Sequence, residues 1–446
     1  MVRSTLSAAT ACVVSALLAG SALAVPAEER APKPDDCKKI YLPGKESTHG
    51  AVMNLTVGNP PQQMGLLSDW TWHSTWIHTP DCAGVHSVNK CIPPGQQYFD
   101  EKKSSTFKKT SYPQQTFNGT DYTPGIPFIT TFGKDTICFH SQVDGSQKCL
   151  DNTVMANTNL TNPLPVVFDI GGVFGFAPVL KGYNETFYPA PFQFFKGGVL
   201  NSVVGWHMCE QLQDAKSCHG QDYMTVLGGT DTSVYNPKDT VFHDIVVDDC
   251  VNSGEHLSLS PRRTNYWSSR WTGFWIGGKP FSLAASNSPN YNATSKNPKC
   301  DAIDPIAIWD EDKFGRGAPM PWDAFHYLVQ QTGATPLDVF NLPGTSPVNP
   351  GAGGLHQVPC SRLQSFPTIS YEIGGTQRIS STPQQYIDTT LIPGKCLLNA
   401  RVWDRPVDGA QTFFGLQVLS RTYLQFDYAT NRVGLAPLDP KLFKRS

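Results

Sequence analysis

Short apolar runs separated by turn residues recur along most of the chain, whereas stretches with helical periodicity are rare. Two of these runs end directly in an acid: GLLSD ends at Asp69, and IAIWD ends at Asp310. Apolar runs of roughly four to eight residues bounded by Gly, Pro, Asn or Asp are typical of strands. The segment MPWDAFHYLVQQTG instead spaces Phe325 and Leu328 on one helical face before Gly333, which predicts a short helix. We therefore expect a mainly β protein.

Each acid-ending run is followed, after a long interval, by two apolar residues and a glycine. VFG ends at Gly175 and FFG ends at Gly415, so the intervals are 175 − 69 = 106 and 415 − 310 = 105 residues. Matched spacing in both halves indicates an internal duplication. A chain of 446 residues also suits two domains of roughly 200 residues each. The pattern predicts two homologous lobes, each of which supplies one acid.

Two acids that meet between two lobes can hydrolyse a bond without a cofactor. When two carboxyls lie close together they do not both ionise readily, so one keeps a proton while the other is an anion. The anion can take a proton from a water while the acid protonates a carbonyl group. Because such acids titrate as a pair, neither role is assigned to Asp69 or Asp310 separately.

The two ends of the chain bear on its location. Residues 1–24 hold Arg3, an apolar run and a small-residue end, which predicts a secretory signal peptide rather than a membrane span. Residues 25–47 are rich in Pro and charge, and they predict a short flexible leader rather than a pro-domain. No later apolar segment reaches spanning length. We therefore expect a protein without a membrane anchor, secreted to the extracellular space or delivered to a vacuole.

Charge and composition restrict the partners. The formal net charge is −2 and no basic block exceeds two residues, which argues against a nucleic-acid partner. Charged residues make up only 16% of the chain, a value that fits many short strands rather than long surface helices. No cysteine pair or histidine cluster has the spacing of a zinc site, so we expect no metal and no cofactor. We expect a monomer.

Cysteines and sequons fit a secreted glycoprotein. Without Cys12 of the signal peptide, neighbours in sequence suggest five disulfides, although other connectivities stay open: Cys82–Cys91, Cys138–Cys149, Cys209–Cys218, Cys250–Cys300 and Cys360–Cys396. Cys37 has no partner in this scheme. Five N-x-[ST] sequons predict glycosylation sites, the first within a strand pattern: Asn54, Asn118, Asn159, Asn184 and Asn292.

Longer motifs surround both acids. MNLTVGNPPQQMGLLSD leads into Asp69, Trp76 follows seven residues later, and Pro319 stands nine residues after Asp310. Four further segments complete the set: YFDEKKSSTFK, GVFGFAP, TVLGGTD and FFGLQVLSRTYLQFDYATNRVGLAP. From about residue 48 to 438, these segments resemble the pepsin-like aspartic peptidases.

The resemblance implies a bilobal pepsin-like fold, in which two homologous β-barrel-like lobes face each other across a cleft. The lobes would cover residues 48–240 and 241–446. Asp69 and Asp310 would be the catalytic acids, and the substrate would be a peptide or protein bound in the cleft. Tyr122 in YTPG would be the flap tyrosine, with the Trp76 indole as its hydrogen-bond donor, unless Tyr122 belongs to a surface hairpin.

The residues beside the acids depart from the family pattern of Asp-Thr-Gly-Ser or Asp-Thr-Gly-Thr. The chain has Asp69-Trp70-Thr71-Trp72 and Asp310-Glu311-Asp312-Lys313 at these places. In the family, the threonine hydroxyls link the two acid loops. Trp70 and Glu311 cannot make that hydroxyl link, so we expect the spacing of the acids to lose its usual support.

The remaining positions of the two loops change as well. The Thr71 backbone N–H can still hold a carboxylate, and the Trp72 indole can in principle replace the lost hydroxyl donor. Lys313 would lower the pKa of a neighbouring acid, whereas Asp312 would raise it. Trp70, Trp72 and Lys313 are thus expected as neighbours of the acids in the cleft.

Two functions remain open at this point. The first is a secreted aspartic endopeptidase with altered flanking motifs, because both acids are kept. The second is a binding protein that has kept the fold and lost hydrolysis, such as an inhibitor, a decoy or a peptide carrier. A site loosened by about 1 Å can lose about a hundredfold in rate, so the sequence leaves the level of activity undecided.

Overall fold

Strands dominate the computed structural model, as the apolar pattern predicts. It describes residues 38–47, 50–80, 97–118, 127–160, 171–209, 218–247, 266–284, 304–311, 317–337, 356–403 and 410–442. In these ranges the α-helices are short: α3 (Ala190–Lys196), α4 (Trp322–Thr332), α5 (Pro383–Tyr386) and α7 (Leu416–Leu419). Short 3₁₀ helices add η2 (Glu101–Lys103), η3 (Glu185–Phe187), η5 (Pro237–Asp239), η8 (Cys360–Ser365) and η9 (Pro440–Leu442).

The largest sheet has 14 strands and combines the first half of the chain with its last two strands. Its hydrogen-bonding order is β12 (Val241–Asp244), β26 (Arg432–Pro437), β25 (Thr422–Asp427), β10 (Val203–Met208), β11 (Tyr223–Leu227), β1 (Ile40–Ser47), β2 (Gly50–Val57), β3 (Gln62–Asp69), β9 (Gly172–Gly175), β4 (Thr75–His78), β8 (Gln147–Leu160), β7 (Pro127–His140) and β5 (Lys108–Lys109), with β6 (Gln115–Asn118) beside β7. Because β2 also pairs with β7, the strands from β2 to β7 close into a barrel.

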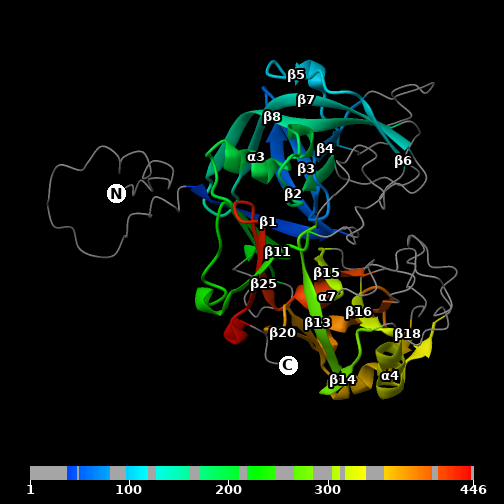
Figure 1. The fold of residues 1–446 in the computed structure, drawn as a ribbon. Coiled ribbons are helices and arrows are strands. Elements are labelled where there is room, and N and C mark those ends of the chain that lie inside the picture. The colour runs from blue at the N-terminus through cyan, green and yellow to red at the C-terminus, as the bar shows by residue number, and fades with distance from the viewer. Residues whose placement is uncertain are drawn as a thin grey trace, which may run out of the picture.

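The second half of the chain forms three smaller sheets. The first is β20 (Gln377–Ser381), β19 (Ile369–Ile373), β13 (Ser268–Ile276), β15 (Ile306–Trp309) and β24 (Gln411–Phe414), with β14 (Lys279–Phe281) beside β13. The others are β16 (Ala318–Pro321) with β23 (Ala400–Trp403), and β17 (Thr335–Pro336), β18 (His356–Val358), β22 (Cys396–Leu398) and β21 (Ile387–Asp388). Figure 1 shows β1, β11 and β25 between an upper and a lower group of strands, consistent with a bilobal pepsin-like fold.

Strands from both ends of the chain join the two groups. β25 pairs with β10 and β26 pairs with β12, so the last strands hydrogen-bond to strands that precede residue 245. The division of the lobes at residue 240 therefore stays a prediction. The expected flexible leader at 25–47 is wrong from Ile40 onward, because β1 pairs with β11 and buries Ile40 and Leu42. The Pro, Gly and Lys residues of this strand hid its β character.

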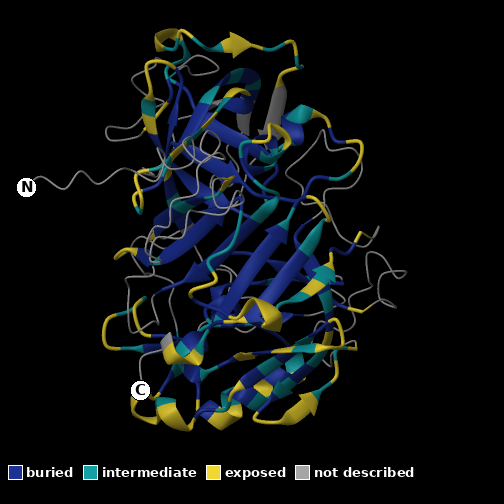
Figure 2. Cartoon of the chain, turned by 90° about the vertical axis from the view of Figure 1, so that its left-hand side faces the viewer, coloured by how far each residue is buried: buried dark blue, intermediate teal, exposed yellow. Residues whose placement is uncertain are grey.

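Aromatic side chains fill the interior, and Figure 2 shows the central strands as buried and many turns and edges as exposed. Trp267 and Trp271, from the aromatic-rich segment at the start of β13, are completely buried. The predicted helix is present as α4, and it ends at Gly333 with a left-handed φ of 66°. Within the described residues, no helix combines the length and the hydrophobicity that a bilayer span requires.

Three of the five suggested disulfides are formed: Cys138–Cys149, Cys209–Cys218 and Cys360–Cys396. The pairs Cys82–Cys91 and Cys250–Cys300, as well as Cys37, lie outside the described residues. Among the sequons, Asn54 and Asn184 are exposed, and the Asn184 side chain accepts a hydrogen bond from the Thr186 amide at the start of η3. Asn118 and Asn159 lie in strands whose side chains are not described there, and Asn292 lies outside the described residues.

Candidate active site

Two parallel strand pairs place the two acids in equivalent positions. β3 runs parallel to β9, with Asp69 opposite Gly175, and β15 runs parallel to β24, with Trp309 opposite Phe414. The backbone N–H of Asp310 then donates to the Phe414 carbonyl at 3.1 Å. The two segments at the ends of each matched interval thus pair as neighbouring parallel strands, and each half of the chain repeats the same unit.

Gly175 shows why the first unit needs a glycine. A Cβ atom at this position would lie 2.5 Å from the carbonyl oxygen of Trp72, closer than real Cβ contacts come. The next residue, Phe176, donates its N–H to the Asp69 carbonyl at 2.9 Å, and Ala177 donates to the Trp72 carbonyl at 2.9 Å. The segment after the glycine therefore binds the backbone of the first acid loop directly.

The Asp69 carboxyl is buried, with 6% of the residue exposed, and Thr71 holds it. The Thr71 backbone N–H donates to Asp69 Oδ1 at 2.8 Å, and its hydroxyl donates to the same oxygen at 2.6 Å. Hydrogen bonds to the charged form of a carboxyl favour that form. Thr71, where the family has glycine, therefore supplies a hydroxyl donor to the acid. The Trp72 indole, which was expected as a replacement donor, donates to Ser74 Oγ at 3.2 Å.

Trp70 lies beneath the first acid loop. Its indole is 2% exposed and makes edge-to-face contacts with Trp206 of β10 and Phe426 of β25, at centroid distances of 4.9 and 5.2 Å. Both partners belong to the strands that join the two halves of the chain. The exchange of the family threonine for Trp70 therefore replaces a hydroxyl contact with apolar packing, which is worth about 0.5–1.5 kcal/mol per aromatic pair beyond area burial.

Glu311 connects the second acid loop to the first. Its side chain is 3% exposed, and its Oε2 atom accepts a hydrogen bond from the Trp70 backbone N–H at 3.1 Å. Burial raises the pKa of the Glu311 carboxyl well above its usual range, and the charges of Asp69 and Asp310 raise it further. The hydroxyl link is missing, as the sequence predicts, but the loops do not lose all support, because the Glu311 carboxyl accepts a hydrogen bond from the first loop.

The other predicted site residues divide into two groups. Trp76, on β4, is buried in a cluster with Trp72 and Phe132 and makes an edge-to-face contact with His78. Tyr122, Asp312 and Lys313 lie outside the described residues. Glu311 was not selected from the sequence as a site residue. The available signal was an acid at the position of the family threonine, two residues after a fully buried strand.

Histidines near the first loop are buried as neutral rings. Burial lowers the pKa of His73 to about 3 and that of His78 to about 4. His73 Nε2 has no hydrogen-bond partner among the described residues, and the ring lies edge-to-face against Tyr183. Neither ring is therefore protonated until the medium becomes strongly acidic.

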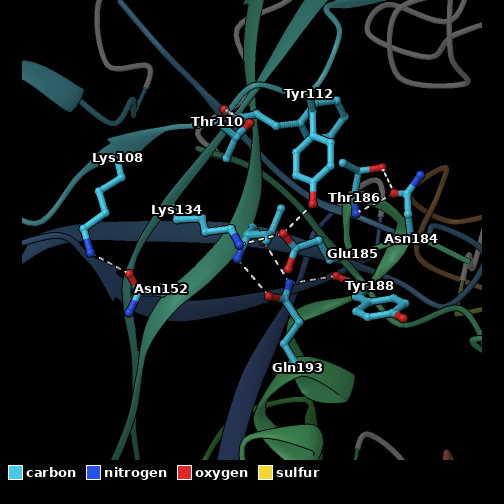
Figure 3. Close-up of polar contacts among 12 residues, drawn as sticks. Lys108, Thr110, Tyr112, Lys134, Asn152, Asn184, Glu185, Thr186, Tyr188 and Gln193 are labelled. Carbon is cyan, nitrogen blue, oxygen red and sulfur yellow. Dashed lines mark hydrogen bonds and ion pairs between the residues drawn. The ribbon is translucent and has the colours of Figure 1, made fainter.

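A polar network supports the barrel next to the cluster of Trp72 and Trp76. Figure 3 shows the Tyr112 hydroxyl and the Lys134 ammonium pointing at the Glu185 carboxylate, and Glu185 Oε1 accepts from Lys134 at 2.6 Å and from Tyr112. Partial burial raises the pKa of Glu185, but the hydrogen bonds from Lys134 and Tyr112 outweigh it and lower the pKa. Tyr112 also packs against the tryptophan cluster, so the network positions that cluster.

Other sites in the described part of the chain do not involve the acids. A cavity of about 600 Å³ is lined by polar and apolar residues of α5, α7 and their neighbours, and neither Asp69 nor Asp310 lines it. The possible metal-ligand atoms of His207, Cys209 and Cys218 lie within 4.8 Å of one another. Because Cys209 and Cys218 form a disulfide, that cluster offers a single ligand.

Comparisons with known proteins identify similar chains. Residues 318–438, which begin just after the Asp310 loop, match the family model described as eukaryotic aspartyl protease. The chain is 33% identical over 414 residues to the secreted aspartic protease LUC8 of a Fusarium species, covering 90% of this chain and 91% of that protein. It is 31% identical over 441 residues to the secreted aspartic protease FUS4 of Gibberella moniliformis, covering 96% and 97%. The aspartic protease-like protein pytH of Aspergillus terreus is 28% identical over 402 residues, with 86% and 89% covered.

Proposed function

The chain belongs to the pepsin-like family of aspartic proteases, and on this basis we propose that Asp69 and Asp310 form its catalytic dyad and activate a water for peptide-bond hydrolysis. The protein is secreted, like its named relatives. Its family implies that a peptide or protein is the substrate. The dyad is the part of this function that the altered loops put in question.

The observation that carries the proposal is the position of Glu311. This carboxyl is bonded to the amide next to Asp69 and directly follows Asp310 in sequence, and the charges of both acids act on it. The hydrogen bond places the Glu311 carboxyl beside the Asp69 loop, and its position in sequence places it beside Asp310. The three carboxyls therefore support a common buried site to which both halves of the chain contribute.

In the proposed reaction the dyad holds one proton. The ionised acid takes a proton from a water whose oxygen bonds to the peptide carbonyl carbon, while the protonated acid donates to the carbonyl oxygen. The carbon–nitrogen bond then breaks as a proton passes to the amine nitrogen. Because the acids act as a coupled pair, the roles are assigned to the pair and not to either residue.

Thr71 supports the dyad whenever its negative charge is on Asp69. Two donors on Asp69 Oδ1, at 2.8 and 2.6 Å, are charge-assisted hydrogen bonds when Asp69 is ionised. They orient the carboxylate and offset the cost of burying its charge. The chain thus supplies from Thr71 the support that the family draws from a later hydroxyl.

The proposal is tested with the secreted protein and a denatured protein substrate, from about pH 3 to about pH 7. We expect cleavage that is blocked by a statine-type transition-state mimic and abolished by Asp69→Asn and by Asp310→Asn, with the exposed Asp239→Asn as the matched control. Equal background in all four proteins would refute the dyad. Peptide binding without cleavage would then favour a binding protein, because the chain would have kept the fold and lost hydrolysis.

A further inference from the structure

Glu311, directly after Asp310, is a buried acid that the hydrolytic scheme does not use. Building on the proposed function, we propose that Glu311 is a positioning residue: as a neutral carboxylic acid it joins the second acid loop to the Trp70 amide and fixes the spacing of Asp69 and Asp310. Its ionisation would add a second negative charge beside Asp69 and Asp310, and this repulsion sets the upper pH limit of the peptidase.

The hydrogen bonds of the Glu311 carboxyl are compatible with a neutral acid. Oε2 accepts from the Trp70 N–H at 3.1 Å, which in a neutral acid makes Oε2 the carbonyl oxygen and leaves the proton on Oε1. Oε1 is buried and has no hydrogen-bond partner in the part of the chain that the structure describes. An unpaired oxygen is far less costly to bury on a neutral acid than on a carboxylate.

A small cavity lies against the same side chain. It measures about 10 Å³ and is lined by Glu311, Trp206, Asp222 and Tyr223 together with apolar groups. Trp206 Nε1 is a second buried donor without a partner among the described residues. A space of about this size holds a single water, and a water oxygen can accept from both the indole and a protonated Oε1. The cavity thus accommodates Glu311 in its neutral form.

The charges around Glu311 oppose its ionisation. Among the described residues, the titratable groups that face it are Asp69, Asp310 and, across the cavity, Asp222 and Tyr223. None of these groups is a cation. The working dyad already carries one negative charge, so a second charge on Glu311 would repel it at low dielectric. The residue that links the two acid loops is therefore itself kept protonated by the negative charge of the dyad.

Two substitutions distinguish the role of the hydrogen bond to the Trp70 amide from the effect of the charge on Glu311. Glu311→Gln keeps a neutral carbonyl acceptor for the Trp70 amide, whereas Glu311→Leu removes the acceptor and keeps the approximate volume. Glu372→Gln, a partly exposed acid on β19, is the matched control. The measurements are kcat and KM as functions of pH, with thermal melting as the check on folding.

We expect Glu311→Gln to keep kcat in acid to within about twofold and to extend activity toward higher pH, because the amide cannot ionise. Glu311→Leu is expected to lower kcat by about tenfold or more while KM changes less than about threefold. A Gln profile that superimposes on the wild type, or a folded Leu variant with wild-type kcat, would overturn the proposal.

A second readout does not depend on catalysis. A folded-state pKa above the unfolded value stabilises the fold fully below the unfolded pKa, and this stability is lost as the pH rises through the folded pKa. In denaturant unfolding, the free energy of unfolding of Glu311→Gln should therefore increase relative to that of the wild type as the pH rises above about 4.5. A constant difference across the range would refute the neutral buried acid. A protein that fails to cleave but shows this trend would refute the proposed function alone.

Discussion

Mild acid is expected to destabilise the fold through three buried histidines. Burial lowers the pKa of His73 to about 3 and that of His78 and His207 to about 4, with Asp231 opposing the effect at His207. The unfolded chain binds protons below pH 6.5 whereas the folded chain does not. The stability from these rings is therefore complete above pH 6.5 and is lost as the pH falls toward the folded values.

The magnitude follows from the interval between the two states. At about pH 5, which is 1.5 pH units below 6.5, each ring loses about 2 kcal/mol at about 1.4 kcal/mol per unit. Three rings together lose about 6 kcal/mol, against a total stability of about 5–15 kcal/mol for a typical domain. Glu311 acts in the opposite direction, because its raised pKa stabilises the fold as the pH falls.

The assay is denaturant unfolding at about pH 7, 6 and 5 for the wild type and His73→Phe. Phenylalanine keeps a ring against Tyr183 and cannot titrate. We expect the stability lost between about pH 7 and pH 5 to shrink by about 2 kcal/mol in this variant, with the exposed His326→Phe as the control. An unchanged loss in His73→Phe would refute the neutral buried ring.

Three further predictions concern the acid loops. Thr71→Val removes the hydroxyl donor to Asp69 and keeps the amide. Because a hydrogen bond to a charged group is lost, kcat/KM should fall by about tenfold to a hundredfold. Wild-type kinetics would contradict this role. Gly175→Ala should lower the yield of folded protein, since its Cβ would meet a carbonyl oxygen at 2.5 Å, whereas Gly65→Ala in β3, with contacts of 3.4 Å, should fold; equal yields would count against the close approach. Trp70→Thr restores the family residue but empties a core position, so denaturation should show a loss of about 3–5 kcal/mol, and a loss below about 1 kcal/mol would mean that the indole is not packed as described.

The paired intervals predicted the central geometry because they reflect a physical contact. An acid-ending strand and a strand ending in two apolar residues and glycine lie side by side in each half, so their separation along the chain is constrained twice. Likewise, α4 followed from apolar spacing and its terminal Gly333. These features are local or repeated, and sequence patterns carry both kinds of information.

The contacts of single side chains were harder to predict. The packing of Trp70 depends on Trp206 and Phe426, which arrive from distant strands, so no local pattern indicates which face of the loop is buried. The link made by Glu311 spans 241 residues and replaces a hydroxyl with a carboxyl. A comparison with the family motif finds the exchange but not the new contact.

The central claim is that Asp69 and Asp310 act as one catalytic unit. The most direct measurement is the cleavage rate of the wild type, Asp69→Asn, Asp310→Asn and the double variant at one acidic pH. If the acids share a proton and a water, each single substitution should lower the rate as far as the double substitution does, because residues that act as a unit are not additive. Substitutions whose effects simply multiply, or a single variant that keeps wild-type activity, would contradict the dyad.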